Sequence, residues 1–206
     1  MSSAAVTAAT EAVRWAVAEH GAGLVLATSM TDSVLVHVAT QVEPDIEVVF
    51  LDTGFHFAET LGTLRRSVAK YALHITVEQP ARDAADVWAD GSEACCAARK
   101  VAPLNRALEG RTAWLSGLRK ADSATRASTS TVEIDRRGLV KVNPLATWSD
   151  DDVEQYIAEH DIVVNPLIAA GYPSIGCWPC TEPAAGDDSR SGRWVGSDKT
   201  ECGLHI

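Results

Sequence analysis

The sequence predicts an α/β fold in which helices flank a mostly parallel sheet. Two observations support this prediction. Short, continuously apolar runs indicate buried strands, and the segments between them have helical length and apolar residues at helical spacing. In such an alternation each helix carries the chain back, so that the next strand starts in the same direction. The short connections leave no room for a separate domain within the alternating region.

The elements of the first half alternate regularly. The expected helices cover residues 4–19, 32–41, 57–71 and 97–108, and the expected strands cover residues 23–28, 47–51, 73–77 and 112–116.

The pattern changes beyond Gly117. Residues 132–134 and 139–142 flank a polar turn and predict a hairpin. Ser149 precedes three aspartates, which predicts an N-capped helix because acidic side chains favour the positive helix end. Residues 181–206 are rich in small and polar residues near their start, and we expect a mobile C-terminal tail there.

Composition narrows the functional classes. The chain has 206 residues, of which 46% are hydrophobic, and a formal net charge of −10. An acidic surface repels phosphate at long range, so we expect no nucleic-acid partner. No apolar run approaches the ~20 residues of a membrane span, and the first residues do not resemble a secretory signal. We therefore expect a cytoplasmic protein without a membrane partner.

Three segments end at the carboxyl edge of the predicted sheet, where ligands bind in open parallel sheets. Residues 28–32 place Ser29 and neighbouring hydroxyl groups at a helix start, which suits a phosphate. Residues 51–54 contain Asp52, Thr53 and Gly54, and residues 116–120 end in a basic pair. Each segment alone is equally compatible with an ordinary cap or turn.

The five cysteines divide into two pairs and one single residue. Cys95 and Cys96 are adjacent, and a disulfide between neighbours is strained. Cys177 and Cys180 form a Cys-x-x-Cys motif whose preceding Gly and Pro make a thioredoxin-like placement poor. Four thiolates on two loops fit either a tetrahedral zinc ion or a [4Fe–4S] cluster, and spacing does not choose between them.

Cys202 differs from the other four. It lies close to the chain end between Glu201 and Gly203, where we do not expect burial. An exposed thiol at this place is expected to be reactive. His205 could support the thiolate or contact an anion.

Basic residues complete the pattern. Seven of the 18 Lys and Arg residues lie in segments expected near the same strand ends, and Arg suits bidentate recognition of phosphate or sulfate. They predict an anion pocket: Arg99, Lys100, Arg119, Lys120, Arg126, Arg190 and Arg193.

These motifs resemble the assimilatory adenylyl-sulfate and phosphoadenylyl-sulfate reductases over nearly the whole chain. The resemblance rests on residues 51–54, 95–104, 116–120, 164–167, 171–181, 192–194 and 201–205. The Cys-Cys, Cys-x-x-Cys and terminal Glu-Cys-Gly-Leu-His elements, in this order, are highly specific.

The resemblance implies an ATP-pyrophosphatase (adenine nucleotide α-hydrolase)-like fold. Residues 1–180 would form one nucleotide-binding domain that includes the cysteine loops, and residues 181–206 the tail with the catalytic residue. It further implies a [4Fe–4S] cluster on Cys95, Cys96, Cys177 and Cys180, and hence adenosine 5′-phosphosulfate as the substrate. The implied substrate-binding residues are Ser29, Asp52, Thr53, Gly54, Lys100, Arg119, Lys120, Arg126, Arg190, Arg193, Trp194 and His205.

The implied activity is thioredoxin-dependent reduction of this substrate to sulfite and AMP in sulfate assimilation. Cys202 would be the nucleophile and would pass through an S-sulfocysteine. Two alternatives stay open at this point: the same chemistry on 3′-phosphoadenylyl sulfate, and a non-redox protein that binds zinc and a nucleotide.

Overall fold

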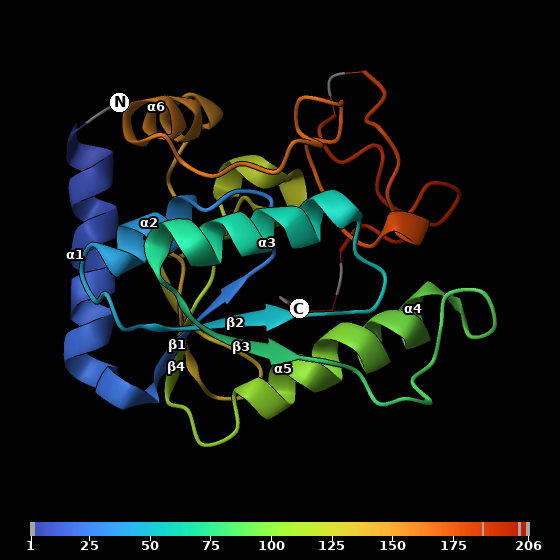
Figure 1. The fold of residues 1–206 in the computed structure, drawn as a ribbon, viewed down its shortest axis with the longest axis horizontal. Coiled ribbons are helices and arrows are strands. Elements are labelled where there is room, and N and C mark those ends of the chain that lie inside the picture. The colour runs from blue at the N-terminus through green and yellow to red at the C-terminus, as the bar shows by residue number, and fades with distance from the viewer. Residues whose placement is uncertain (1–2, 187, 202, 205–206) are drawn as a thin grey trace.

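The computed structural model describes residues 3–186, 188–201 and 203–204, and it confirms the predicted α/β architecture. The sheet has six strands in the order β3-β2-β1-β4-β6-β5, all parallel except the edge strand β5 (Figure 1). The strands are β1 (Leu24–Thr28), β2 (Glu47–Leu51), β3 (His74–Glu78), β4 (Ala113–Leu115), β5 (Val132–Ile134) and β6 (Val140–Val142).

The helices lie close to the predicted positions. They are α1 (Ser3–His20), α2 (Val34–Thr40), α3 (Ala58–Tyr71), α4 (Gly91–Cys96), α5 (Ala102–Ala107) and α6 (Asp150–His160). The predicted cap is confirmed, because the Ser149 hydroxyl accepts a hydrogen bond from the Asp152 N–H at 3.1 Å at the start of α6. The predicted hairpin is confirmed by the antiparallel pairing of β5 and β6.

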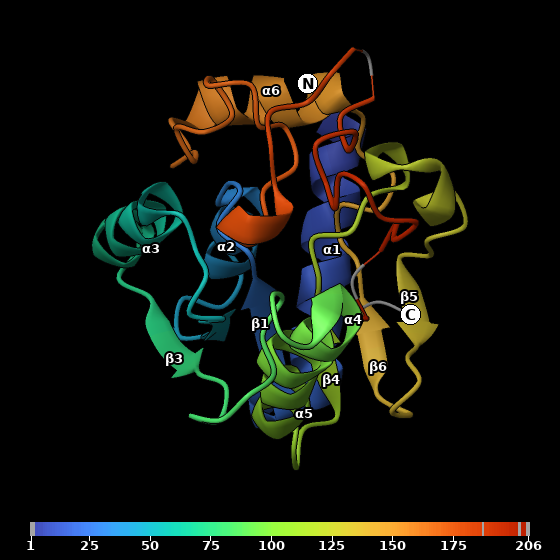
Figure 2. The same ribbon diagram turned by 90° about the vertical axis from the view of Figure 1, so that its right-hand side faces the viewer.

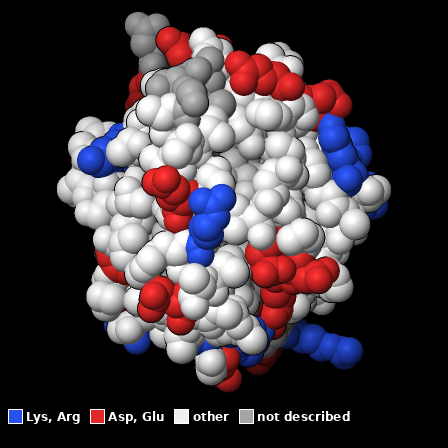
Figure 3. Space-filling view, turned by 90° about the vertical axis from the view of Figure 1, so that its left-hand side faces the viewer, with Lys and Arg blue, Asp and Glu red and all other residues white. Residues whose placement is uncertain are grey.

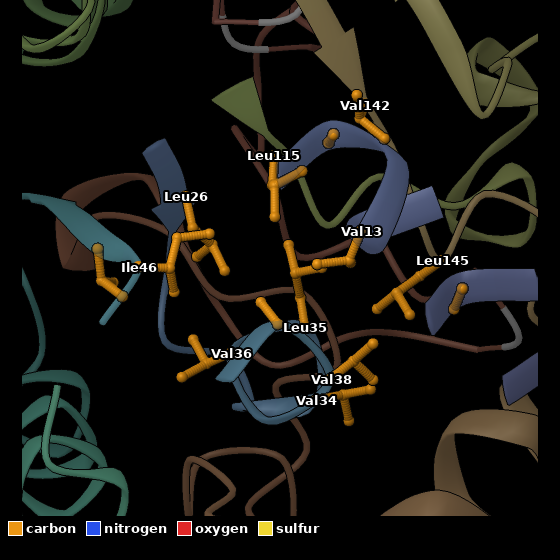
Figure 4. Close-up of a cluster of buried hydrophobic side chains, with 14 of the residues drawn as sticks. Val13, Leu26, Val34, Leu35, Val36, Val38, Ile46, Leu115, Val142 and Leu145 are labelled. Atoms are coloured by element: carbon orange, nitrogen blue, oxygen red, sulfur yellow. The ribbon is translucent and has the colours of Figure 1, made fainter. Parts of the chain in front are cut away.

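Alternate residues of the central strands pack on opposite faces of the sheet, as a period of two requires. Leu24 and Leu26 face one core together with side chains of α1, α2, α3 and α6. Figure 4 shows Leu26 in this core with Val13 of α1 and Leu35 of α2. Val25 faces a second, smaller core with Leu104 of α5 and Trp114 of β4. Helices therefore cover both faces of the sheet, which explains why the central strands β1 and β4 carry apolar side chains on both faces.

One sequence expectation about local structure is wrong. Cys95 and Cys96 were expected on a loop, but they end helix α4, and the chain continues through a π-helical turn, Ala97–Val101, into α5. A π turn holds one residue more than an α turn and changes which side chains face the same side. Apolar periodicity does not reveal such a turn, so the prediction placed the helix start after the cysteines.

The face of the molecule that α1 covers shows no large charged patch among the described residues (Figure 3). Acidic and basic side chains are scattered there between wide uncharged areas. Within the described ranges, no helix is both long enough and apolar enough to span a bilayer.

Candidate active site

A cleft of about 580 Å³ opens at the carboxyl ends of β1, β2 and β4, where the topology predicted a ligand site. Thr28 and Ser29 line it after β1, Thr53 after β2, and Ser116 and Arg119 after β4. The strand ends are fixed by the core beneath them. This side of the cleft is therefore a rigid frame.

The turn after β1 is held in an unusual conformation. Met30 is fully buried with φ of 59°, a left-handed conformation that is costly for a residue with a side chain. The buried Asn165 side chain donates hydrogen bonds to the Met30 carbonyl at 3.2 Å and the Thr60 hydroxyl at 3.0 Å. Asp32 follows on the cleft wall, and burial raises the pKa of its carboxyl.

Three arginines of the cleft are bound to carboxylates. Arg119 forms ion pairs with Asp122 at 2.9 Å and Asp150 at 2.8 Å. Arg126 and Arg190 both pair with Glu201, at 2.8 and 3.3 Å. The cleft thus holds a strong concentration of positive charge that acidic side chains of the same chain partly neutralise.

Four cysteines line a second, smaller cavity beside the cleft, named here the cysteine cavity. Cys95, Cys96 and Cys177 are buried and Cys180 is half-buried. Burial, and then the neighbouring thiols Cys96 and Cys177, raise the pKa of Cys95 to about 11. The Thr53 hydroxyl lies 3.3 Å from the Cys177 sulfur, which connects this cavity to the end of β2.

The spacing of the donors bears on what the cysteine cavity could hold. In the part of the chain that the structure describes, no three Cys, His, Asp or Glu side chains are grouped closely enough to hold one metal ion. A single zinc ion draws its sulfurs together at about 2.3 Å each. A [4Fe–4S] cluster takes the same four thiolates, so the cysteines that line this cavity are a donor set for either group.

Three residues line both the cysteine cavity and the cleft: Lys100, Arg193 and Trp194. The Arg193 guanidinium lies 4.3 Å from the Trp194 ring centre and donates a hydrogen bond to the Ser174 hydroxyl at 3.2 Å. A Cβ at Gly176 would overlap this guanidinium. Glycine at 176 therefore allows Arg193 to lie against the chain just before Cys177.

The C-terminal segment closes the far side of the cleft and is named here the C-terminal wall: residues 181–186, 188–201 and 203–204. Thr181 pairs with Arg193, and the Trp194 N–H donates to the Cys180 carbonyl at 3.0 Å. Lys199 forms an ion pair with Glu93 of α4 at 3.0 Å, and the Gly203 carbonyl accepts from Arg136 at 2.8 Å. The segment therefore crosses between α4 and the β5–β6 hairpin (Figure 2). Its predicted mobility stays a prediction.

The structure brings most of the predicted substrate-binding residues to the cleft. Ser29, Thr53, Lys100, Arg119, Arg126, Arg190, Arg193 and Trp194 line it. Asp52, Gly54 and Lys120 do not. Asp52 accepts hydrogen bonds from the Gly54 N–H at 3.0 Å and from Gln79 at 3.1 Å, and Lys120 is exposed. Cys202 and His205 lie outside the described residues.

Sequence reasoning missed the acidic residues of the cleft, of which Asp32 and Glu201 are examples. Both stand inside motifs that were recognised, but the prediction searched for cations that would meet an anion. Arg99 is also different from the expectation. Its side chain donates to the carbonyls of Thr53, Ala84 and Ala85 and packs on the Phe55 ring, so it ties loops together rather than facing the cleft.

Comparison with known proteins agrees with this geometry. The chain is 50% identical over 191 residues to a protein of Rhodococcus opacus named adenosine 5′-phosphosulfate reductase, covering 88% of this chain and 77% of that protein. A protein of the same name from Mycobacteroides abscessus is 47% identical, covering 96% of this chain and 87% of its own length.

Among solved structures, the phosphoadenylyl-sulfate reductase of Candida auris in a phosphate complex matches with a TM-score of 0.74 and 27% identity, covering 84% of this chain and 89% of that chain. The FMN adenylyltransferase of Candida glabrata shares the fold, with a TM-score of 0.66 and 13% identity, covering 87% of this chain and 64% of that chain. The family model described as phosphoadenosine phosphosulfate reductase domain matches residues 23–183. The chain is therefore a member of the phosphoadenosine phosphosulfate reductase domain family.

Proposed function

We propose that this protein reduces adenosine 5′-phosphosulfate to sulfite and AMP in sulfate assimilation, with thioredoxin as the electron donor. The observation that carries the proposal is the juxtaposition of an arginine-lined cleft at the strand ends with a four-cysteine cavity, the two sharing Lys100, Arg193 and Trp194. The names of relatives that are 47–50% identical support this substrate. A cytoplasmic location is part of the proposal.

The cleft suits a nucleotide that carries a second acidic group. Its volume of about 580 Å³ lies in the range of small-molecule sites, and its floor combines strand-end hydroxyls with apolar side chains. Lys100 and the cleft arginines would neutralise the phosphate and sulfate oxygens of the substrate. Their positive charge would help most as negative charge develops on the departing phosphate oxygen.

Cys202 is the proposed nucleophile. Its thiolate attacks the sulfur, the bond between sulfur and the bridging oxygen breaks, and AMP leaves with the bond electrons. The product is an S-sulfocysteine. One thiolate of thioredoxin then attacks the Cys202 sulfur, sulfite leaves, and the second thioredoxin thiol resolves the mixed disulfide. The dithiol is oxidised by two electrons and the sulfate sulfur is reduced by two. Two described residues close to Cys202 in sequence, Glu201 and Leu204, line the cleft, which supports this role.

Cys95, Cys96, Cys177 and Cys180 would hold a [4Fe–4S] cluster. When bound, this group supplies charge beside the cleft that helps to orient the anionic substrate. Lys100 lines both cavities and would hold its ammonium group between the cluster and the substrate oxygens.

The decisive experiment compares sulfite release from adenosine 5′-phosphosulfate and from its 3′-phosphorylated form, each with reduced thioredoxin. We expect rapid release from the first and little from the second. The reverse preference would replace the proposed substrate with the alternative. Cys202→Ser should abolish sulfite release from either nucleotide while leaving folding intact, and full activity in this variant would contradict the proposed nucleophile.

Anaerobic purification tests the cofactor independently of activity. A brown protein with about four irons per chain is expected. A colourless protein with one zinc would support the zinc alternative instead. In Cys202→Ser the visible absorbance should persist, whereas Cys177→Ser should reduce it.

A further inference from the structure

The Glu201 carboxylate occupies a site built for an oxyanion. Arg126 donates to both of its oxygens, from Nε at 2.9 Å and from Nη2 at 2.8 Å. The Thr125 hydroxyl donates at 3.0 Å, and Arg190 lies 3.3 Å away. The Ser123 hydroxyl completes this oxyanion site at 3.5 Å.

This ion pair is largely shielded from water. The side chains of Arg126, Arg190 and Glu201 are only 16%, 12% and 13% exposed. Burial opposes ionisation of Glu201, but the hydrogen bonds and charge of Arg126 outweigh it and hold its pKa below the usual value. The Glu201 carboxylate is therefore charged at neutral pH, so the two arginines already bind an anion.

The same donors would serve a substrate oxyanion. The guanidinium fork of Arg binds the paired oxygens of a carboxylate and those of a phosphate or sulfate in the same bidentate geometry. Arg126, Arg190 and Glu201 all line the cleft. An anion that binds these two arginines from the cleft would take the position of the Glu201 carboxylate. Each Arg126 nitrogen already faces a carboxylate, since Nη1 donates to Asp122 at 3.0 Å.

We propose that Glu201 is an internal competitor for tetrahedral oxyanions at the oxyanion site, so that docking of the chain at Glu201 and binding of a sulfate or phosphate group there exclude each other. The identity of the physiological anion rests on the proposed function, but the competition does not. Glu201 directly precedes Cys202 in sequence. The exchange therefore links arrival of the substrate to the position of the segment that carries the proposed nucleophile. Other ties of this segment include Lys199 on Glu93, Arg190 on the Thr200 carbonyl and Gly203 on Arg136.

Titration calorimetry with inorganic sulfate on the full-length protein as purified tests the competition. Glu201→Gln keeps the side-chain shape and removes the charge, and it should bind sulfate at least about five-fold more tightly than the wild type, a coupling of ordinary size. Glu154→Gln removes a charge from the same cleft, and Glu93→Gln loosens the same segment at Lys199. Both controls should stay within about two-fold of the wild type, because neither carboxylate occupies the oxyanion site.

AMP separates the two sources of the oxyanion. If the AMP phosphate occupies the site, AMP and sulfate compete and Glu201→Gln tightens both. If the sulfate group of the substrate does, AMP leaves sulfate binding unchanged and only sulfate binding tightens. Unchanged or weaker affinity of Glu201→Gln for both probes would overturn the proposal.

A second measurement follows the C-terminal segment itself. Trypsin cleaves after Lys199, whose side chain is only 3% exposed. Sulfate should accelerate this cleavage in the wild type and not in Glu201→Gln, and an unchanged wild-type rate would contradict the proposal. If the protein releases sulfite but sulfate does not compete with Glu201, the inference is rejected and the proposed function stands. If sulfate competes with Glu201 but the protein releases no sulfite, the inference stands and the proposed function is rejected.

Discussion

The two sides of the cleft are stabilised in different ways. The frame at the ends of β1, β2 and β4 rests on fully buried side chains such as Leu26, Val48 and Leu115. The C-terminal wall is held by ion pairs and backbone hydrogen bonds, and Trp194 is its most deeply buried large side chain among the described residues. Dissolved ions screen and compete with ion pairs, but they do not replace contacts between buried apolar side chains. The frame can therefore keep its shape while the wall exchanges partners.

The largest effect is expected from the frame. Leu26→Ala removes a fully buried side chain from the main core and should lower the free energy of unfolding by about 2–5 kcal/mol. Urea denaturation followed by circular dichroism measures it. Val195→Ala, at an exposed position of the wall, should leave the urea midpoint nearly unchanged. Equal losses for the two variants would remove the contrast between frame and wall.

A smaller, local effect is expected from Gly192→Ala. A Cβ at this position would overlap the Glu182 carbonyl oxygen. The Glu182 N–H donates to the Gly192 carbonyl at 2.8 Å, so the two backbone segments lie side by side. Crowding of this kind costs about 1–3 kcal/mol, and here it falls on the wall alone. We expect loss of sulfite release and faster tryptic cleavage after Lys199, with an unfolding midpoint close to the wild type. A cooperative loss of the whole fold would show that wall and frame are one unit.

The outer edge of the frame should respond to alkaline pH. Burial raises the pKa of the Tyr156 phenol to about 12, and its oxygen lies 2.8 Å from His37 Nδ1. The unfolded chain ionises near the ordinary value of 10, so the folded state loses stability as the pH rises from about 10 to 12. Tyr156→Phe should cost about 1 kcal/mol at pH 7 and approach the wild type at pH 11. A constant difference between the two would contradict this account.

The smallest effect is a gain. Gly62 lies within α3, and a Cβ there meets the Arg66 guanidinium at 3.5 Å, an ordinary contact. Gly62→Ala should stabilise the protein by about 0.5–1 kcal/mol, because alanine loses less backbone entropy in a helix. Thermal unfolding measures it, and sulfite release should not change. A destabilised variant would mean that α3 needs glycine for a reason other than its helical conformation.

The sequence predicted the sheet almost completely because β1, β2 and β4 are mainly apolar runs and the hairpin of β5 and β6 flanks a polar turn. It predicted the cleft because Ser29, Thr53 and Arg119 follow strand ends. It did not predict that Glu201 fills part of the cleft, since contact with Arg126, 75 positions away, leaves no periodic trace. It also misplaced Cys95 and Cys96, because the π turn after them follows from packing and not from local propensity.

That π turn limits how far the length of the chain between α4 and α5 can vary. Five residues, Ala97–Val101, separate the cysteines of α4 from α5, and Lys100 within them lines both cavities. Each residue of a helix turns the chain by about 100°. Deleting one alanine would keep every reactive group and yet rotate the cysteines relative to Leu104 of the second core. Insertions and deletions at this place should therefore be far less tolerated than substitutions.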